Sequence, residues 1–310
     1  MKAVRYHQYG DSEVLRYEEA DRPTPGPGQV LIQVAGMAFN PVDAGIRGGY
    51  LRQVFPLEFP HIPGHDVAGT IAELGPGVVG YRVGDPVIGF LPMTASGAAA
   101  EFALAQVEAL TAAPGKVDLA DAAALPSTGL TAWQALFEHA GLQAGQRILI
   151  NGASGAVGGF AVQLAKQAGA VVIATAGPRG LEKARAHGAD EVLDYTSASV
   201  PAAITEPVDA VLNLARLDQP QLHELLDRVR PGGVFVTTVP PGLESVEGDV
   251  RAVTMFVRSD VGQLAGLVAK VDAGELRIDV SARYPLAELA RVHQLSDAGK
   301  LPGKVVVTPA

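Results

Sequence analysis

The sequence contains no cysteine. This absence excludes disulfide bonds, thiolate nucleophiles and every zinc site that needs a sulfur ligand. Positive charge is also scarce, because 24 lysines and arginines stand against 33 aspartates and glutamates, which gives a net charge of -9. No block of lysine and arginine could follow a phosphate backbone, so no nucleic-acid partner is expected.

Long apolar runs are missing as well. No stretch approaches the roughly 20 apolar residues of a membrane span, and the first residues, MKAVRYHQYG, lack the apolar region of a signal peptide. We therefore expect no membrane association and a cytoplasmic location. What the sequence does have is 48% apolar residues in a chain of 310, enough for a sizeable core and long enough for two domains.

The first part of the chain is dense in proline and glycine. Short β-like runs at 30–34, 67–72 and 86–89 lie between turn signals, which predicts a compact, mostly-β domain over residues 1–120. After Leu119 the texture changes to alanine-rich helical stretches, and Trp133 and Phe137 are spaced to share one helix face.

Strands and helices then alternate. The expected strands are RILIN, VVIATA, EVLDY, DAVLNL, GVFVTT and AVTMFV. This order predicts an α/β fold with right-handed crossovers and a doubly wound parallel sheet, over residues 121–260. A helix is expected at 261–273, and the strand-like KVVVT near the end predicts that residues 261–310 return to complete the first domain.

The strongest chemical signal is a glycine-rich loop between a buried strand and an amphipathic helix. Its pattern is Gly152-x-x-Gly155-x-x-Gly158 rather than the strict GxGxxG. Glycines there permit a tight turn and close approach of a pyrophosphate, while the helix N-terminus offers free N–H groups, so we expect a dinucleotide. The alternative is a turn that only packs the helix closely. The expected contacts are Gly152, Ser154, Gly155, Ala156, Val157 and Gly158.

The next strand indicates which nicotinamide nucleotide is bound. An NAD site usually has an acidic residue about 20 residues after the loop, but here Thr175 and Arg179 occur and no acid appears before Glu182. Arginine can bind a 2′-phosphate, which favours NADPH, unless Arg179 is simply a solvated residue at a helix start. Tyr195 is expected to flank the adenosine, or else to lie at the edge of the core.

Several motifs in order resemble a known family. AFNPVDAGIRGGY, FPHIPGHDVAGTIAELGPGVVGYRVGDPVIG, ALPSTGLTAWQAL and NGASGAVGGFAVQLAKQAGA are similar to the zinc-independent, zeta-crystallin-like quinone oxidoreductases of the medium-chain dehydrogenase/reductase superfamily. The resemblance implies a GroES-like catalytic domain, a Rossmann domain that binds NADPH, an active site between them and a homodimer formed through the Rossmann domains.

The resemblance also implies roles for individual residues. Asn40 matches an active-site asparagine near the nicotinamide, where zinc-dependent relatives have a cysteine ligand, and Tyr50 matches a tyrosine at the substrate entrance. From the residues alone, Asn40 could simply form a turn and Tyr50 could be a loop aromatic. The remaining cofactor positions implied are Thr128, near which Thr131 lies, and Asn213, Leu214, Val239, Pro240, Phe256, Val257 and Lys304. Each has a plainer reading as a cap, strand-end packing or, for Lys304, a solvated lysine.

A metal site is not expected. His65 resembles a zinc ligand of the alcohol dehydrogenases, but its cysteine partners are missing, and Ile-Pro-Gly separates it from His61. Without a metal to polarise the substrate, an electrophilic acceptor is favoured. We expect hydride transfer from NADPH to a quinone, with Asn40 orienting the acceptor. Reduction of an activated C=C bond in an enone or enoyl substrate, and an NADPH-binding structural or regulatory protein without turnover, stay open.

Overall fold

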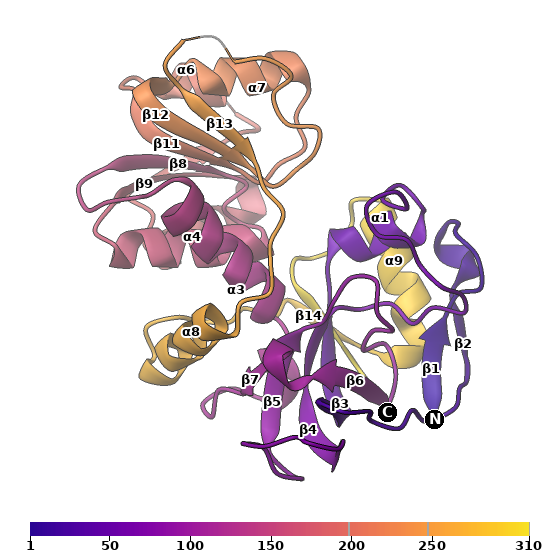
Figure 1. Ribbon diagram of the computed structural model, residues 1–310. Helices are drawn as coiled ribbons and strands as arrows, with labels where there is room; N and C mark the ends of the chain where they lie inside the picture. The colour runs from indigo at the N-terminus through magenta and orange to yellow at the C-terminus, as the bar shows by residue number, and fades with distance from the viewer. Residues whose placement is uncertain (198, 247, 310) are drawn as a thin grey trace. The chain divides into compact units, whose positions relative to one another are not determined.

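The computed structural model describes residues 1–197, 199–246 and 248–309, and the chain divides into two compact units (Figure 1). Unit 1 comprises residues 1–127 and 259–310, and unit 2 comprises residues 128–258. The first junction therefore lies after Ser127 and not near residue 120 as expected. The difference arises because helix α2 (Leu119–Ala122) packs on strand β3 (Gln29–Phe39), where Gly36 leaves room for the backbone of Ala120.

Unit 2 contains a six-stranded parallel sheet in the order β10-β9-β8-β11-β12-β13. In chain order this is 3-2-1-4-5-6, the doubly wound arrangement of a Rossmann fold, and the expected parallel sheet is confirmed. The strands are β8 (Arg147–Asn151), β9 (Val171–Ala176), β10 (Glu191–Asp194), β11 (Val208–Asn213), β12 (Val229–Thr237) and β13 (Arg251–Thr254).

Helices connect these strands. They are α4 (Ala156–Gln167), α5 (Leu181–Ala186), α6 (Val200–Ala203) and α7 (Gln219–Leu226). Helix α3 (Pro126–Trp133), which begins in unit 1 and continues as a π-helix (Gln134–His139), precedes the first of these strands. Trp133 and Phe137 do share a face, with ring centroids 4.6 Å apart. The apolar stripe of α7 packs with Leu149, Val211 and Phe235 of the sheet in a continuous core.

Strand β13 is shorter than the sequence predicts. AVTMFV suggests a strand to Val257, but β13 ends at Thr254, and Phe256 is 53% exposed. The reason is its neighbour: β12 ends at Thr237, which is opposite Thr254, so the residues beyond Met255 have no strand to pair with.

Unit 1 contains a seven-stranded sheet in the order β14-β15-β3-β4-β5-β7, with β6 paired to β3, and a small antiparallel pair of β1 and β2. Strand β15 pairs antiparallel with β3, so the last segment of the chain lies beside a strand of the first. The remaining strands are β1 (Lys2–Arg5), β2 (Arg16–Glu19), β4 (Asp66–Leu74), β5 (Pro86–Phe90), β6 (Phe102–Gln106), β7 (Leu110–Ala112), β14 (Ala282–Pro285) and β15 (Val305–Thr308).

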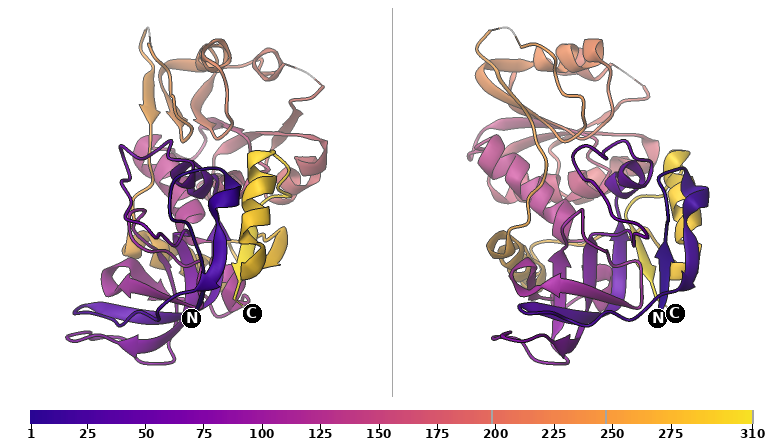
Figure 2. Two further views of the ribbon diagram at one scale, coloured as in Figure 1. Left: turned by 90° about the vertical axis from the view of Figure 1, so that its right-hand side faces the viewer. Right: turned by 45° about the vertical axis from the view of Figure 1, so that its right-hand side comes forward.

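Three further helices belong to unit 1: α1 (Pro41–Arg47), α8 (Val261–Ala273) and α9 (Leu289–Asp297). Helix α8 covers the stretch that the sequence predicts. Helices α1 and α9 lie side by side (Figure 2), because the buried guanidinium of Arg47 donates to His293 Nδ1 at 3.0 Å and to Asp297 at 2.9 Å. This contact fixes the helix that follows Asn40.

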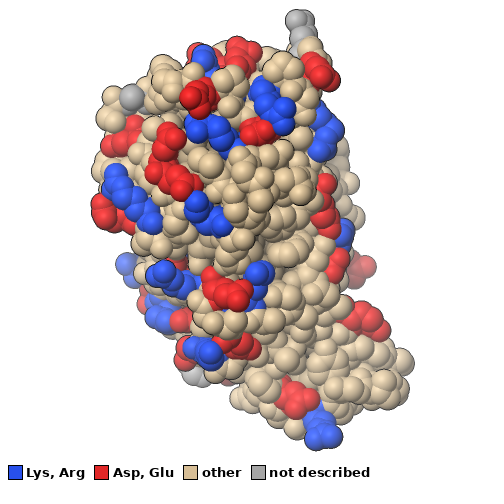
Figure 3. Space-filling model, turned by 90° about the vertical axis from the view of Figure 1, so that its left-hand side faces the viewer, with Lys and Arg blue, Asp and Glu red and all other residues tan. Residues whose placement is uncertain are grey.

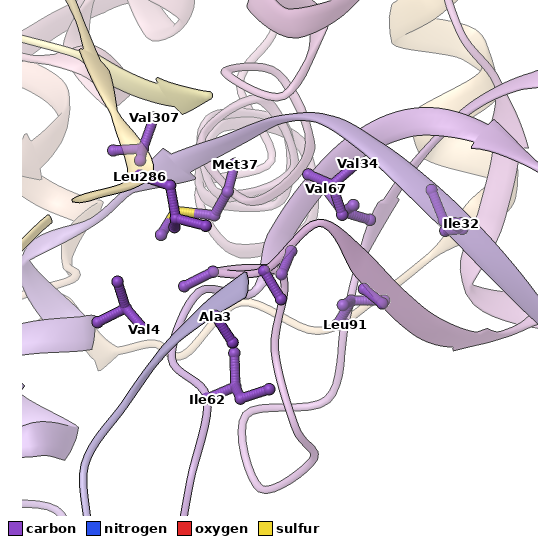
Figure 4. Close-up of a cluster of buried hydrophobic side chains, with 14 of the residues drawn as sticks. Ala3, Val4, Ile32, Val34, Met37, Ile62, Val67, Leu91, Leu286 and Val307 are labelled. Carbon is purple, nitrogen blue, oxygen red and sulfur yellow. The ribbon is translucent and has the colours of Figure 1, made fainter. Parts of the chain in front are cut away.

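The core of unit 1 gathers side chains from both ends of the chain. Figure 4 shows Met37 beside Leu286 and Val307, in one cluster of buried apolar residues that also contains Ala3 and Val67. Burial of each large side chain contributes roughly 1.5 to 3 kcal/mol, so the returning segment is part of the stabilising core.

The surface carries mixed charge. On the face drawn in Figure 3, lysine and arginine are interspersed with aspartate and glutamate, and large areas are neutral. No helix in the described part of the chain has the length and apolar character needed to cross a bilayer.

Candidate functional site

The glycine loop lies at the carboxyl edge of the unit 2 sheet, directly after β8. Gly152 has φ of +92°, a left-handed conformation that disfavours any side chain. A Cβ on Gly158 would lie 2.4 Å from the carbonyl oxygen of Gly152, so the first turn of α4 can approach the loop only with glycine there. Gly155 is the N-cap of α4, and the N–H groups of the first turn, which includes Ala156 and Val157, have no partner within the helix.

A row of buried polar side chains runs along the same edge. We call Thr175, Asn151, Asn213 and Thr237 the polar ladder, because they come from the ends of four neighbouring strands and are hydrogen-bonded in sequence. Thr175 Oγ1 donates to Asn151 Oδ1 at 2.7 Å, Asn151 Nδ2 donates to Asn213 Oδ1 at 2.8 Å, and Asn213 Nδ2 donates to Thr237 Oγ1 at 3.2 Å. All four residues are buried.

The ladder changes the interpretation of Thr175. The sequence predicts that this residue contacts the cofactor, but its side chain is fully buried and its hydroxyl accepts the N–H of Gly152 at 2.9 Å. Thr175 therefore supports the glycine loop through its hydrogen bond to the backbone of Gly152. Asn213 is likewise buried, whereas the following Leu214 is half-buried.

Exposed residues gather at the end of β9. Arg179 is exposed in a short 3-10 helix (Pro178–Gly180) directly after β9. Tyr195 follows β10, is 57% exposed, and its hydroxyl lies 2.8 Å from where a Cβ on Gly177 would be. Ser154 of the glycine loop is equally close to Gly180. The structure thus brings Ser154, Arg179 and Tyr195 to one end of the sheet.

The other cofactor positions implied by the resemblance are placed less uniformly. Leu214, Val239 and Pro240 follow the ends of β11 and β12, at the same edge as the glycine loop. Thr128 and Thr131 are buried within α3. Phe256 and Val257 follow β13 by two or three residues, outside the strand that was expected to present them.

Asn40 occupies the centre of a buried polar cluster in unit 1. It lies between β3 and α1, where its backbone N–H donates to the carboxylate of Asp43 at 2.7 Å. Its amide Nδ2 donates to Asp66 Oδ2 at 2.8 Å and to the carbonyl of Ala38 at 3.3 Å. Its Oδ1 accepts from Lys304 Nζ at 2.7 Å. Both amide hydrogens are therefore engaged, and one Oδ1 lone pair is left for any other partner.

Lys304 is not a solvated lysine. Only 4% of it is exposed, and its ammonium lies 3.5 Å from Asp66 in addition to its contact with Asn40. Asp66 is bound from its other side by Ser127, whose N–H and hydroxyl both donate to the carboxylate. Lys304 belongs to unit 1, and a contact with cofactor phosphate stays a prediction.

The cluster extends to a carboxyl and an imidazole with shifted pKa values. Burial, reinforced by the charge of Asp66, raises the pKa of Asp43 to about 7, although the N–H of Asn40 opposes the shift. Burial lowers the pKa of His65 to about 4. The 3.5 Å approach of His65 Nε2 to Asp43 Oδ1 is thus not an ion pair at neutral pH, because the His65 imidazole is then uncharged.

Histidine does not gather into a metal site among the residues that the structure describes. No group of three or more histidine, aspartate or glutamate side chains there is arranged to hold an ion. His61, whose pKa burial lowers to about 4, packs its ring against Tyr6 with centroids 5.4 Å apart. Tyr50, in contrast, is 87% exposed just beyond the end of α1, and its ring lies over Gly48.

Sequence reasoning missed several polar residues of these two sites. Asn151, Thr237, Asp43 and Ser127 were not singled out. The first three hold predicted residues in place, and Ser127 holds Asp66, the partner of Asn40. A signal was available for two of them, because Asn151 and Thr237 are polar residues that end buried apolar strands. Asp43 and Ser127 become recognisable only when the fold brings distant segments together.

Comparison with known proteins agrees with this organisation. A family model described as "Alcohol dehydrogenase GroES-like domain" matches residues 26–115, and one described as "Zinc-binding dehydrogenase" matches residues 187–307. A chloroplastic quinone-oxidoreductase homolog of Spinacia oleracea is 41% identical, covering 100% of this chain and 98% of the relative. A chloroplast envelope quinone oxidoreductase homolog of Arabidopsis thaliana is 34% identical with the same coverage. Because both names refer to the chloroplast, the cytoplasmic location stays a prediction.

Solved structures show the same fold over the whole chain. A quinone oxidoreductase from Coxiella burnetii superposes with a TM-score of 0.89 at 29% identity, covering 100% of this chain and 99% of the other. A mycobacterial protein complexed with NADPH gives 0.88 at 27% identity, covering 100% of both chains. The CurK enoyl reductase gives 0.87 at 28% identity, covering 100% and 99%. The chain therefore belongs to the quinone oxidoreductase group of the medium-chain dehydrogenase/reductase superfamily and is an NAD(P)H-dependent oxidoreductase.

Proposed function

We propose that this protein is an NADPH:quinone oxidoreductase. The observation that carries the proposal is the combination at the carboxyl edge of the unit 2 sheet: a glycine loop shaped for a pyrophosphate, and an exposed Arg179 where NAD-binding proteins present an acid. The names of the relatives support the quinone as acceptor. When bound, NADPH supplies the hydride.

The residues of unit 2 fit this nucleotide. The N–H groups of Ala156 and Val157, at the start of α4, would bind the pyrophosphate with the positive end of the helix dipole behind them. Arg179 would bind the 2′-phosphate by charge-assisted hydrogen bonds, and Tyr195 would cover the adenosine. Thr175 is too deeply buried for a ribose contact and supports Gly152 instead.

The residues of unit 1 would serve the acceptor. The exposed ring of Tyr50 offers an apolar face to a flat quinone. The Asn40 amide donates both hydrogens within the protein, so we revise its expected role: it anchors Lys304 and Asp66 and leaves a fixed dipole near the acceptor. The proton needed to complete quinone reduction would come from water.

The direct test compares acceptors and coenzymes. Oxidation of NADPH and of NADH is followed at 340 nm with 1,4-benzoquinone, a naphthoquinone, a 2-enal and an enoyl thioester. We expect the quinones to give the highest kcat/KM and NADPH to be preferred. A protein that is stabilised by NADPH but oxidises it with none of these acceptors would instead be a binding protein without turnover.

Coenzyme preference is tested separately with Arg179→Ala. Loss of a charge-assisted contact worth roughly 1.5 to 3 kcal/mol raises KM for NADPH about 10- to 100-fold and leaves KM for NADH nearly unchanged. The matched control is Arg185→Ala, because Arg185 is a surface residue of α5 paired with Glu182. An equal rise in KM for NADPH and for NADH in Arg179→Ala would show that Arg179 does not bind the 2′-phosphate.

Reduction of an activated C=C bond is the second candidate, favoured by the structural similarity to the CurK enoyl reductase. In the acceptor comparison it is identified by a kcat/KM for the 2-enal or the enoyl thioester that exceeds the value for every quinone. Both activities need the same nucleotide site, so the two candidates differ only in the acceptor that Tyr50 and its surroundings admit.

A homodimer through unit 2 is also proposed. Strand β13 lies at the edge of the six-stranded sheet, where a second copy could add its own edge strand. Sedimentation equilibrium is expected to give twice the mass of 32.0 kDa, and a single-chain mass would exclude the dimer.

A further inference from the structure

The polar ladder has a feature that simple strand packing does not require. Its four members sit in the buried interior of a sheet whose other core positions are apolar. Buried hydrogen-bonded side chains contribute little net stability compared with apolar residues of the same shape. Their presence at the end of four adjacent strands therefore calls for a role other than stability.

The hydrogen bonds of the ladder all run in one direction. The N–H of Gly152 donates to Thr175, and the donors continue through Asn151 and Asn213 to Thr237. Thr237 Oγ1 then donates to the carbonyl of Val239 at 3.4 Å, and it also accepts the N–H of Val239 at 3.2 Å. Each amide orientation is fixed by its neighbours, since reversal of one asparagine would place donor against donor.

The two ends of the ladder lie at two different parts of the proposed nucleotide site. At one end, Gly152 opens the loop that would bind the pyrophosphate. At the other end, Val239 follows β12, on the side implied for the ribose and nicotinamide. In the register of the sheet, Asn213 is opposite both Asn151 and Thr237, so no strand interrupts the connection.

We propose that Asn151 and Thr237 are positioning residues of the nucleotide site, and that the polar ladder couples the glycine loop to the segment at Val239. This inference rests on the proposed binding of NADPH. Loss of one hydrogen bond of the ladder leaves its donor and its acceptor without each other, and the side chains of the remaining members reorient to find new partners. A change at Thr237 thereby reaches Gly152, three side chains away.

The experiment uses Thr237→Val, which keeps the shape of the side chain and removes the hydroxyl, with Thr238→Val as the matched control. Thr238 is the next residue and lies outside the ladder. Binding of 2′,5′-ADP to the full chain is measured by calorimetry, because this fragment carries the adenosine and its phosphates but has no nicotinamide half. We expect about five- to tenfold weaker binding in Thr237→Val and less than a twofold change in Thr238→Val.

A second readout does not depend on nucleotide binding. Hydrogen exchange of the Gly152 amide, measured by NMR on the intact protein, is expected to be at least several-fold faster in Thr237→Val than in Thr238→Val. The double variant Thr175→Val/Thr237→Val should then lose less binding than the two single variants together.

The outcomes separate the two proposals. If 2′,5′-ADP binding and Gly152 exchange in Thr237→Val both match the control, the coupling is absent and the inference is overturned. If the unmodified protein binds neither NADPH nor 2′,5′-ADP, the proposed function fails, while faster exchange of Gly152 would still support the ladder as a coupling device.

Discussion

At the residue scale, the buried ammonium of Lys304 is the most consequential single charge in unit 1. Burial lowers the pKa of Lys304, while the carboxylates of Asp66 and Asp43 oppose that shift. The cation is held by its contact with Asn40 and by Asp66, and both partners are buried. A cation in this position fixes the orientation of the Asn40 amide, which the sequence identified only through a family resemblance.

Removal of this cation should destabilise the protein. In Lys304→Met the carboxylate of Asp66 loses its buried counter-charge, and we expect the free energy of unfolding to fall by about 3 to 5 kcal/mol in urea denaturation. The control is Lys300→Met, since Lys300 is exposed and its substitution should change stability by less than about 0.5 kcal/mol. Equal stability of the two variants would show that the Asp66 contact is not stabilising.

Single residues also mark where sequence reasoning reached its limit. Gly152, Gly155 and Gly158 were predictable, because local sequence alone dictates a strand, a tight loop and a helix start. The burial of Lys304 was not, because it results from pairing of β15 with β3, two strands separated by more than 250 residues. The bond from Ser127 to Asp66 was not predictable for the same reason, because these two residues are far apart in the sequence.

At the scale of single elements, α4 and α8 offer a direct comparison of two helical glycines. Gly158 faces the backbone of the loop, where a Cβ would lie 2.4 Å from a carbonyl oxygen, whereas Gly266 is exposed with nothing within 4 Å. We expect Gly158→Ala to lower the free energy of unfolding by about 1 to 3 kcal/mol and to weaken NADPH binding at least tenfold.

Gly266→Ala should do the opposite. Alanine is favoured over glycine in a helix interior, so stability should rise by roughly 1 kcal/mol without a change in nucleotide binding. Chemical denaturation and NADPH titration of both variants provide the measurement. A neutral or stabilising Gly158→Ala would contradict the close approach of α4 to the loop.

The elements show which structural features the sequence pattern predicts well. The strands of unit 2 and helix α8 follow from apolar runs and periodicity, which are local signals. The end of β13 and the π-helical turn at Gln134–His139 do not, since the first depends on where β12 stops and the second on a change of hydrogen-bond register within one helix.

At the scale of the whole molecule, buried titratable groups should set the response to acid. Burial lowers the pKa of His61 and of His65 to about 4 and that of His293 to about 3, from 6.5. Each histidine thus contributes stability that is present above pH 6.5 and is lost as the pH falls toward the folded value. Asp43 acts in the other direction, because its raised pKa adds stability that is lost as the pH rises toward 7.

Between pH 6 and 5 the unfolded chain protonates the three histidines, while the folded protein protonates Asp43. The unfolded chain therefore binds about two more protons than the folded protein. The free energy of unfolding should therefore fall by about 3 kcal/mol per pH unit in urea denaturation. His293→Gln, which keeps an acceptor for Arg47, should reduce this slope by about 1.4 kcal/mol per unit. An unchanged slope in that variant would mean that His293 is not neutral in the folded protein.

The pairing of β15 with β3 also has a consequence for biosynthesis. Residues 128–258 form an uninterrupted compact unit and can fold as soon as they leave the ribosome, whereas the sheet of unit 1 waits for residues 305–308. The apolar faces of β3 and β4 therefore stay exposed to solvent while more than 200 further residues are translated. We expect chaperones to bind the nascent chain mainly during this interval. Unit 2 begins to be synthesised after unit 1 but completes its folding first.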